Sequence, residues 1–183
     1  MALSGQLTAS SLQTLLQDAA LAGDWSLDAS RSTVELKTKS MWGLATVKGV
    51  FREVTGEGTV AADGKVSGTI RVAAASIDTK NSRRDKHLRS NDFFDVDNYP
   101  DIIFVADGAA PSSDGVTVTG TLTVHDRRRP VSFPATVSVP GGGEVWLDAE
   151  VQINRADFGL TWSQLGVASM SNTITVHAIF NRR

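Results

Sequence analysis

Apolar and polar residues alternate along most of the chain after residue 25, and a period of two is typical of a β-strand with one buried face. The pattern is clearest over residues 116–124, where valines and a leucine share one face and threonines take the other. Similar runs follow at 131–139, 145–153 and 174–180, and shorter ones come earlier, at 34–36 and 66–72. The chain is therefore predicted to be mostly β-structure.

Turn residues separate these runs. Asp-Gly pairs occur at 63–64, 107–108 and 114–115, and Pro140 is followed by three glycines. Such sequences favour tight hairpin turns, so we expect an antiparallel sheet with little helix between its strands. Closing that sheet into a barrel would remove its exposed edges. A two-sheet sandwich satisfies the same periodicity and remains an alternative at this point.

The start of the chain has the period of a helix instead. Thr8 or Ser10 is its candidate N-cap and Gly23 its candidate end. The apolar stripe of this predicted helix consists of Leu12, Leu15, Leu16, Ala19 and Ala20. We therefore predict an N-terminal amphipathic helical extension over residues 1–23 that packs against the main domain, with a disordered extension as the alternative.

A second break in the strand rhythm lies at residues 81–89, which predict a short crossover helix capped by Thr79 or Asn81. No composition shift or internal repeat divides the rest of the chain. Residues 24–183 are therefore expected to form one domain.

The composition of the chain argues against several kinds of site and partner. Its 183 residues include no cysteine, which excludes disulfides, thiolate nucleophiles and zinc sites that need sulfur. The formal net charge of −2 and the absence of a basic strand studded with aromatic residues argue against a nucleic-acid partner. The first residues lack the basic front and continuous apolar stretch of a secretion signal, and no segment approaches the roughly 20 apolar residues of a membrane span. We expect a cytoplasmic protein with no integral membrane span.

Catalytic and metal-binding patterns are missing as well. His87, His125 and His177, the only histidines, fall on separate predicted elements, whereas a metal site needs three or four convergent ligands. There is no Gly-x-Ser-x-Gly turn, and the predicted inner faces of the strands carry no acid or base. We predict no metal, no cofactor and no enzymatic activity.

The predicted inner faces carry an unusual number of small residues: Gly49, Gly68, Gly120, Ala135, Ala149 and Ala178. A tightly filled small barrel would place bulky branched side chains at most of these positions. Repeated small residues leave apolar volume that an apolar ligand can occupy. The alternative is that the glycines relieve strain where strands bend.

Several segments resemble the signature of the YceI-like family. They are AASIDT at 74–79, RDKHLRS at 84–90, DFFDVDNYP at 92–100, TGTLTVH at 119–125 and INRADFGLTW at 153–162. The resemblance implies an all-β fold, an extended antiparallel eight-stranded lipocalin-like β-barrel with a long hydrophobic pocket. It also implies binding of polyisoprenoids or other long-chain amphiphiles, no catalytic residues, and a possible homodimer. Trp42 stands where many relatives are less bulky, so we expect it to narrow one end of the pocket.

Candidate ligand contacts follow from the pattern and the resemblance together. The predicted apolar pocket consists of Val47, Phe51, Ile70, Leu88, Phe93, Phe94, Phe104, Leu122, Phe133, Phe158, Leu160, Trp162 and Ile174. Arg84, His87 and Arg89, on the predicted crossover helix, are head-group candidates because cations there could neutralise a diphosphate or carboxylate. The alternatives are plain core packing for the aromatic residues and a solvated helix face for the cations.

The leading hypothesis is a protein that binds, carries or sequesters a long-chain polyisoprenoid lipid, either a polyprenyl diphosphate or an isoprenoid quinone precursor. A fatty acid or fatty amide would fit the same apolar interior. Two other classes remain open: a lipid-modifying enzyme, and an interaction module that docks through its N-terminal helix.

Overall fold

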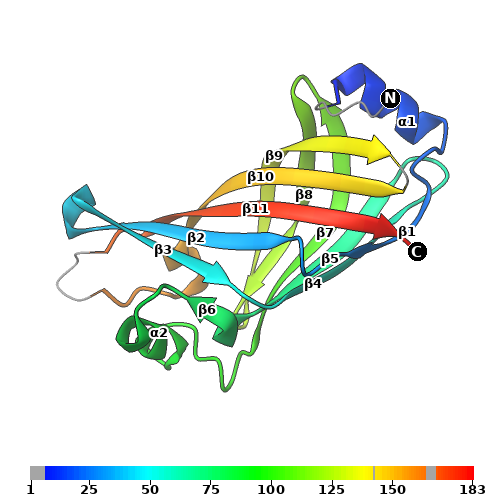
Figure 1. Cartoon of the computed structure of the whole chain (residues 1–183). Helices are drawn as coiled ribbons and strands as arrows, with labels where there is room; N and C mark the ends of the chain where they lie inside the picture. Colours follow the sequence, from blue (N-terminus) through cyan, green and yellow to red (C-terminus); the bar gives the residue numbers. More distant parts are fainter. Residues whose placement is uncertain (1–6, 142, 164–167) are drawn as a thin grey trace.

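The chain forms a closed antiparallel β-barrel with one helix at each end (Figure 1). The computed structural model describes residues 7–141, 143–163 and 168–183. The strands are β1 (Gly23–Leu27), β2 (Thr33–Ser40), β3 (Ala45–Phe51), β4 (Val54–Val60), β5 (Val66–Ala73), β6 (Ile77–Asp78), β7 (Asp101–Ser112), β8 (Gly115–Val124), β9 (Arg127–Gly141), β10 (Glu144–Asn154) and β11 (Ser171–Arg182). They form one sheet in the order β1-β4-β5-β7-β8-β9-β10-β11-β2-β3-β6, and β1 also pairs with β11.

The strand segments make eight continuous lines around the barrel. β1 and β2 pair in succession with β11, and β4 and β3 pair with β1 and β2 in the same way. β5 and β6 form the next line, because β5 pairs with β4 and β6 pairs with β3. The ring closes where β1 meets β11, so the predicted eight-stranded antiparallel barrel is confirmed and the sandwich is excluded.

Alternation along each line directs apolar side chains inward. On β8, Val116, Val118 and Val124 are buried, while Thr119 between them is exposed. Gly120 shares the inward face, and a Cβ there would lie 2.2 Å from the Val105 carbonyl oxygen and 2.8 Å from the Phe104 ring. Only glycine fits at that crossing of β7 and β8.

Helix α1 (Ala9–Gln17) lies across one end of the barrel, against β7 and β8 (Figure 1). The Ser11 N–H donates to the Thr8 Oγ1, so Thr8 is the N-cap, one of the two candidates that the sequence offers. The prediction that the helix runs on to Gly23 was wrong. Ala19 has a φ of 54°, which takes the backbone out of the helix, and Gly23 already belongs to β1. Residues 1–6 of the predicted extension lie outside the described residues.

The opposite end, the crossover end, is made by the chain between β5 and β7. It holds η2 (Ala74–Ser76), β6 and helix α2 (Ser82–Arg89), which is capped by the Asn81 side chain. Two further short helices, η1 (Met41–Gly43) and η3 (Arg155–Phe158), lie at the same end. Within the described ranges, no helix is long and apolar enough to cross a membrane.

Candidate functional site

An apolar cavity of about 320 Å³ runs along the barrel interior. Side chains from all eight strand lines and from α1 line it, beginning with Leu12 and Leu16 at the α1 end and finishing with Phe158 and Leu160 at the crossover end. Small-molecule sites commonly measure roughly 300–1,000 Å³ and have mostly apolar walls. The barrel therefore encloses a space suited to an elongated apolar molecule.

Only some of the small inward residues create this space. Gly68 and Ala149 line the cavity, as predicted. At Gly49 and Gly120 the space is filled, because the Ile77 and Phe104 side chains lie 2.8 Å from where a Cβ would stand. Ala135 and Ala178 also lie outside the cavity lining. Further small residues on β4 and β7 line the cavity: Gly58, Ala106, Gly108 and Ala109.

Most of the predicted pocket residues line the cavity. These are Phe51, Ile70, Phe93, Phe94, Phe104, Leu122, Phe133, Phe158, Leu160 and Ile174. Val47, Leu88 and Trp162 do not. Leu88 packs behind the crossover-end core, and Trp162 is 41% exposed with its ring 4.1 Å from the His87 ring. Ligand contact by any of these residues stays a prediction.

Trp42 does not narrow the pocket, contrary to our expectation. It is 82% exposed at the tip of the β2–β3 hairpin. A left-handed backbone at Met41 and Trp42, with φ values of 51° and 54°, forms the turn in which this side chain is exposed to solvent.

Helix α1 closes one end of the cavity. Leu12 and Leu16 are 2% and 9% exposed and line the cavity together with Leu21. Hydrogen bonds hold the segment before and after the helix. The Leu7 N–H donates to the Val137 carbonyl, and the Trp25 indole N–H donates to the Leu21 carbonyl. The apolar stripe of the helix is therefore part of the cavity wall.

The crossover end differs because inward polar groups gather there. Arg155 is 5% exposed, and its guanidinium donates to the carbonyl oxygens of Leu160 and Trp162 at 2.7 Å each and of Ser169 at 3.0 Å. Burial lowers the pKa of this guanidinium, although an arginine stays charged at any ordinary pH. Among the described residues, no carboxylate lies within ion-pair distance of it. The cavity thus has a buried positive charge at one end.

Two neutral polar side chains lie near that charge. Asn172 is 6% exposed and lines the cavity, and it pairs directly with Thr38 across β11 and β2. The Thr38 Oγ1 is buried and finds no hydrogen-bond partner in the part of the chain that the structure describes. Buried polar atoms normally have partners, so this end has hydrogen-bonding capacity left over.

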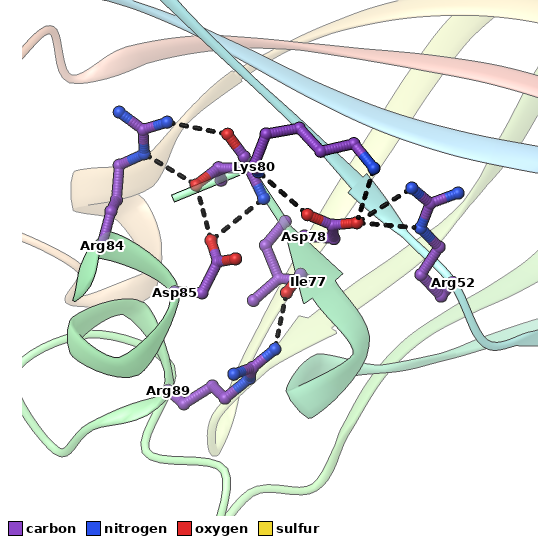
Figure 2. A network of polar contacts seen from close by, with 8 residues as sticks. Arg52, Ile77, Asp78, Lys80, Arg84, Asp85 and Arg89 are labelled. Atoms are coloured by element: carbon purple, nitrogen blue, oxygen red, sulfur yellow. Dashed lines mark hydrogen bonds and ion pairs between the residues drawn. The ribbon is translucent and has the colours of Figure 1, made fainter. Parts of the chain in front are cut away.

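The three head-group candidates on α2 have other roles. Arg84 donates to the Thr79 side chain and carbonyl, and Arg89 donates to the Ile77 carbonyl (Figure 2). Arg89 also donates to the Ala75 carbonyl. His87 contacts Asp92 at 3.2 Å. None of the three lines the cavity. Arg84 and Arg89 therefore connect α2 to the backbone at and beside β6. β6 is the last strand in the sheet order, so within the described residues its outer side has no neighbouring strand to bond with.

The same network includes Asp78, which accepts hydrogen bonds from the Lys80 backbone N–H and from Arg52 (Figure 2). These contacts hold the pKa of the Asp78 carboxyl well below its usual range. A carboxyl with a lowered pKa in the folded state stabilises the protein above its unfolded pKa of about 3.9, and that contribution is lost as the pH falls.

We expect Asp78→Asn to weaken the acid dependence of stability. The urea midpoint of the parent should fall more steeply between about pH 5 and pH 2 than that of the variant. Asp97→Asn, at an exposed position of the same crossover, is the matched control. Equal pH slopes for the two variants would contradict the assignment.

Arg155 and Asn172 were missed as polar cavity residues at the sequence level. Arg155 lies within the INRADFGLTW segment and Asn172 starts the last alternating run, so the relevant signal was a polar residue on a predicted inner face. The direction of Arg155 depends on the loop after β10 folding back over the barrel, which periodicity does not reveal.

Within the described residues, no group of three or more His, Cys, Asp or Glu side chains could hold a metal. Glu57 is the acidic residue among those that line the cavity, and its exposed carboxylate contacts Arg183 at 3.2 Å. The lining of the cavity can hold an apolar chain with a polar end.

Comparison with known proteins decides the family. Residues 25–181 match the family model of the YceI-like domain. The chain belongs to the YceI-like family. Protein YceI of Escherichia coli is 31% identical over 163 residues, which cover 82% of each chain.

Solved structures share the YceI-like fold. BcnA of Burkholderia cenocepacia superposes with a TM-score of 0.76 at 23% identity, covering 84% of this chain and 98% of that one. A polyisoprenoid binding domain from Saccharophagus degradans superposes with a TM-score of 0.72 at 16% identity, covering 87% and 98%. Helix α1 precedes the segment that matches the YceI-like model.

Proposed function

We propose that this protein binds one long-chain isoprenoid amphiphile, a polyprenyl diphosphate or an isoprenoid quinone precursor, and carries or sequesters it. The tail lies along the cavity, and the polar head lies toward Arg155 and Asn172. One observation carries the proposal: the cavity is apolar from the α1 leucines onward and has inward polar groups at the crossover end.

The apolar length of the cavity supports binding of the tail. Each methylene removed from water contributes about 0.8 kcal/mol, so a long chain binds without any polar contact along the wall. The structural relative from Saccharophagus degradans is named a polyisoprenoid binding domain, which favours an isoprenoid as the chain.

The charge at Arg155 supports an anionic or strongly polar head. Its guanidinium already donates to four backbone carbonyls, which leaves one N–H and the buried positive charge for a phosphate or carboxylate oxygen, with the Asn172 side chain nearby. A fatty acid or fatty amide could use the same groups. The identity of the tail therefore decides between an isoprenoid and an acyl ligand.

Binding rather than turnover follows from the residues that line the cavity. A lipid-modifying enzyme needs an acid, base or nucleophile directed at its substrate. The described lining offers Glu57, which is exposed and contacts Arg183, and otherwise no titratable group except Arg155.

The test has two parts. Mass spectrometry of an organic extract of the protein, purified from its native host, should detect one isoprenoid amphiphile per chain. Titration with geranylgeranyl diphosphate, geranylgeraniol and oleamide, followed by the fluorescence of Trp25 in the cavity wall, should rank the diphosphate first. Asn172→Leu, which keeps the branching of the side chain but removes its polar atoms, should reduce the preference for the diphosphate over the alcohol about tenfold. Acyl lipids in the extract, or equal affinities for diphosphate and alcohol, would contradict the proposal.

A further inference from the structure

The tip of the β2–β3 hairpin lies at the crossover end of the barrel (Figure 1). It exposes a group of large apolar side chains. Met41, Trp42 and Leu44 are 51%, 82% and 85% exposed. Large apolar side chains that gather on a surface mark an interaction site more often than isolated ones do. We call residues 41–44 the apolar tip.

The backbone of the apolar tip is unusual for these residue types. Met41 and Trp42 have φ values of 51° and 54°, in the left-handed region that glycine and asparagine occupy most readily. Strained backbone of this kind tends to occur at functional sites. Here the strained backbone holds the Trp42 side chain away from the barrel, so burial of that side chain in the protein does not offset the strain.

Three lysines lie just below the apolar tip. Lys37 and Lys39 on β2 and Lys48 on β3 are exposed and alternate with inward residues. Lys37 pairs directly with Lys48 across the two strands, a like-charge arrangement that disfavours the hairpin by itself. Among the described residues, none of the three forms an ion pair.

We propose that the apolar tip inserts into the surface of an anionic lipid membrane, with the three lysines contacting its head groups. Tryptophan favours the boundary between head groups and acyl chains, where its ring is buried and its indole N–H stays hydrated. Lysines near the surface of an anionic leaflet add to the affinity. The tip therefore combines the two contributions that a peripheral membrane site needs.

A second copy of this chain fits the same surface less well. In a twofold dimer the same patch of both copies forms the interface, so Lys37, Lys39 and Lys48 of the two copies would bring six positive charges into one contact. An anionic lipid surface would neutralise the three positive charges, whereas a second copy would add three more. The charge arrangement thus selects a membrane over self-association.

The tip is also connected to the polar end of the cavity. The Ser169 N–H donates to the Lys39 carbonyl, and the Ser169 carbonyl accepts from Arg155. Membrane docking through the apolar tip would bring the crossover end of the barrel to the lipid surface. The docking itself requires no ligand in the cavity.

The experiment is sedimentation of the full chain with vesicles of phosphatidylcholine alone or with about 30% phosphatidylglycerol, with no isoprenoid added. We expect binding to the anionic vesicles and a blue shift of tryptophan fluorescence that Trp42→Ser removes. The double variant Trp42→Ser, Leu44→Ser should bind about tenfold more weakly or worse. Replacing the three lysines by glutamine should cost about fivefold each on anionic vesicles.

Val105→Ser is the matched control, because Val105 is 43% exposed on the flank of the barrel, on β7. It should bind like the parent. Thermal unfolding of every variant checks that the barrel is intact, since all the substituted side chains are exposed.

Undiminished vesicle binding by the double variant, or no binding by the parent, overturns the proposal. A dimer that the double variant abolishes, without vesicle binding, overturns it as well and assigns the tip to a second copy. Because no isoprenoid is present, the outcome is independent of the ligand titrations.

Discussion

Ala149→Phe is expected to reduce the isoprenoid content of the purified protein about tenfold or more while leaving the barrel folded. Ala149 is 7% exposed on β10 and lines the cavity, so a phenyl ring there occupies space that the lipid tail would fill. Each methylene displaced from apolar contact costs ~0.8 kcal/mol, and two displaced methylenes correspond to about tenfold in affinity. The ring enters existing empty volume, so the usual cost of overpacking a filled core does not apply in full.

Glu150→Phe provides the matched control. It introduces the same side chain one residue further along β10, on the exposed outer face. Lipid content is measured by quantitative mass spectrometry of organic extracts, and folding by circular dichroism and thermal unfolding. If Ala149→Phe kept the full lipid content of the parent, the cavity would not be the lipid site.

Arg155→Ala is expected to destabilise the fold by about 3 kcal/mol or more, because it leaves buried carbonyl groups without donors at ~1–3 kcal/mol each. The guanidinium serves Leu160, Trp162 and Ser169 at once. For a domain of this size the loss corresponds to a fall in Tm of roughly 6–12 °C. Arg155→Lys should recover only part of it, because an ammonium lacks the planar fork that reaches several carbonyls.

Urea unfolding and calorimetry measure this effect, and Arg128→Ala at an exposed position of β9 is the control. Proteolysis in the segment after β10 should accelerate in Arg155→Ala and stay unchanged in the control. A loss below about 1 kcal/mol would show that water replaces the guanidinium without cost, and would remove the structural role assigned to Arg155.

The two predictions separate the parts of the site. Ala149 tests the apolar wall, which can change without affecting any hydrogen bond. Arg155 tests the polar end, where stability and head-group binding depend on the same side chain. Asn172→Leu separates these two roles, since the Asn172 side chain makes a single hydrogen bond within the described part of the chain, to the Met170 carbonyl at 3.1 Å.

The barrel was predictable because its information is local. Alternation in β8, β9, β10 and β11 shows which side chains face inward, and turn residues mark the hairpins that join β4 to β5, β7 to β8 and β9 to β10. The prediction of a turn at Asp107-Gly108 was wrong, because this pair lies inside β7, where the register with β8 shifts between Ala106 and Gly108. The pocket residues on strands, such as Phe104, Leu122 and Ile174, follow from the same parity and do line the cavity. The segments from 74 to 100 and from 153 to 162 carry enough family-specific sequence to indicate the fold on their own.

The functions of the charged and aromatic residues were not predictable in the same way. Arg84 and Arg89 form a basic cluster in the sequence, but their partners are backbone carbonyls brought close by the crossover. Periodicity gives no direction for a side chain in an irregular segment, so Trp162 and Leu88 were placed in the pocket when they lie outside its lining. Trp42 was expected inside and is exposed, because the left-handed turn at the apolar tip reverses its direction.

By itself, the sequence determined the strands with clear alternation, the inward parity of their side chains, the existence of the two helices and the family, since each depends on neighbours along the chain or on motifs read in order. The tertiary structure alone decided that α1 forms a wall of the cavity, that Arg155 is buried among backbone carbonyls, and that the apolar tip is exposed. Those three facts depend on which distant segments meet when the barrel closes. The order of apolar and polar residues along the chain contains no information about such contacts.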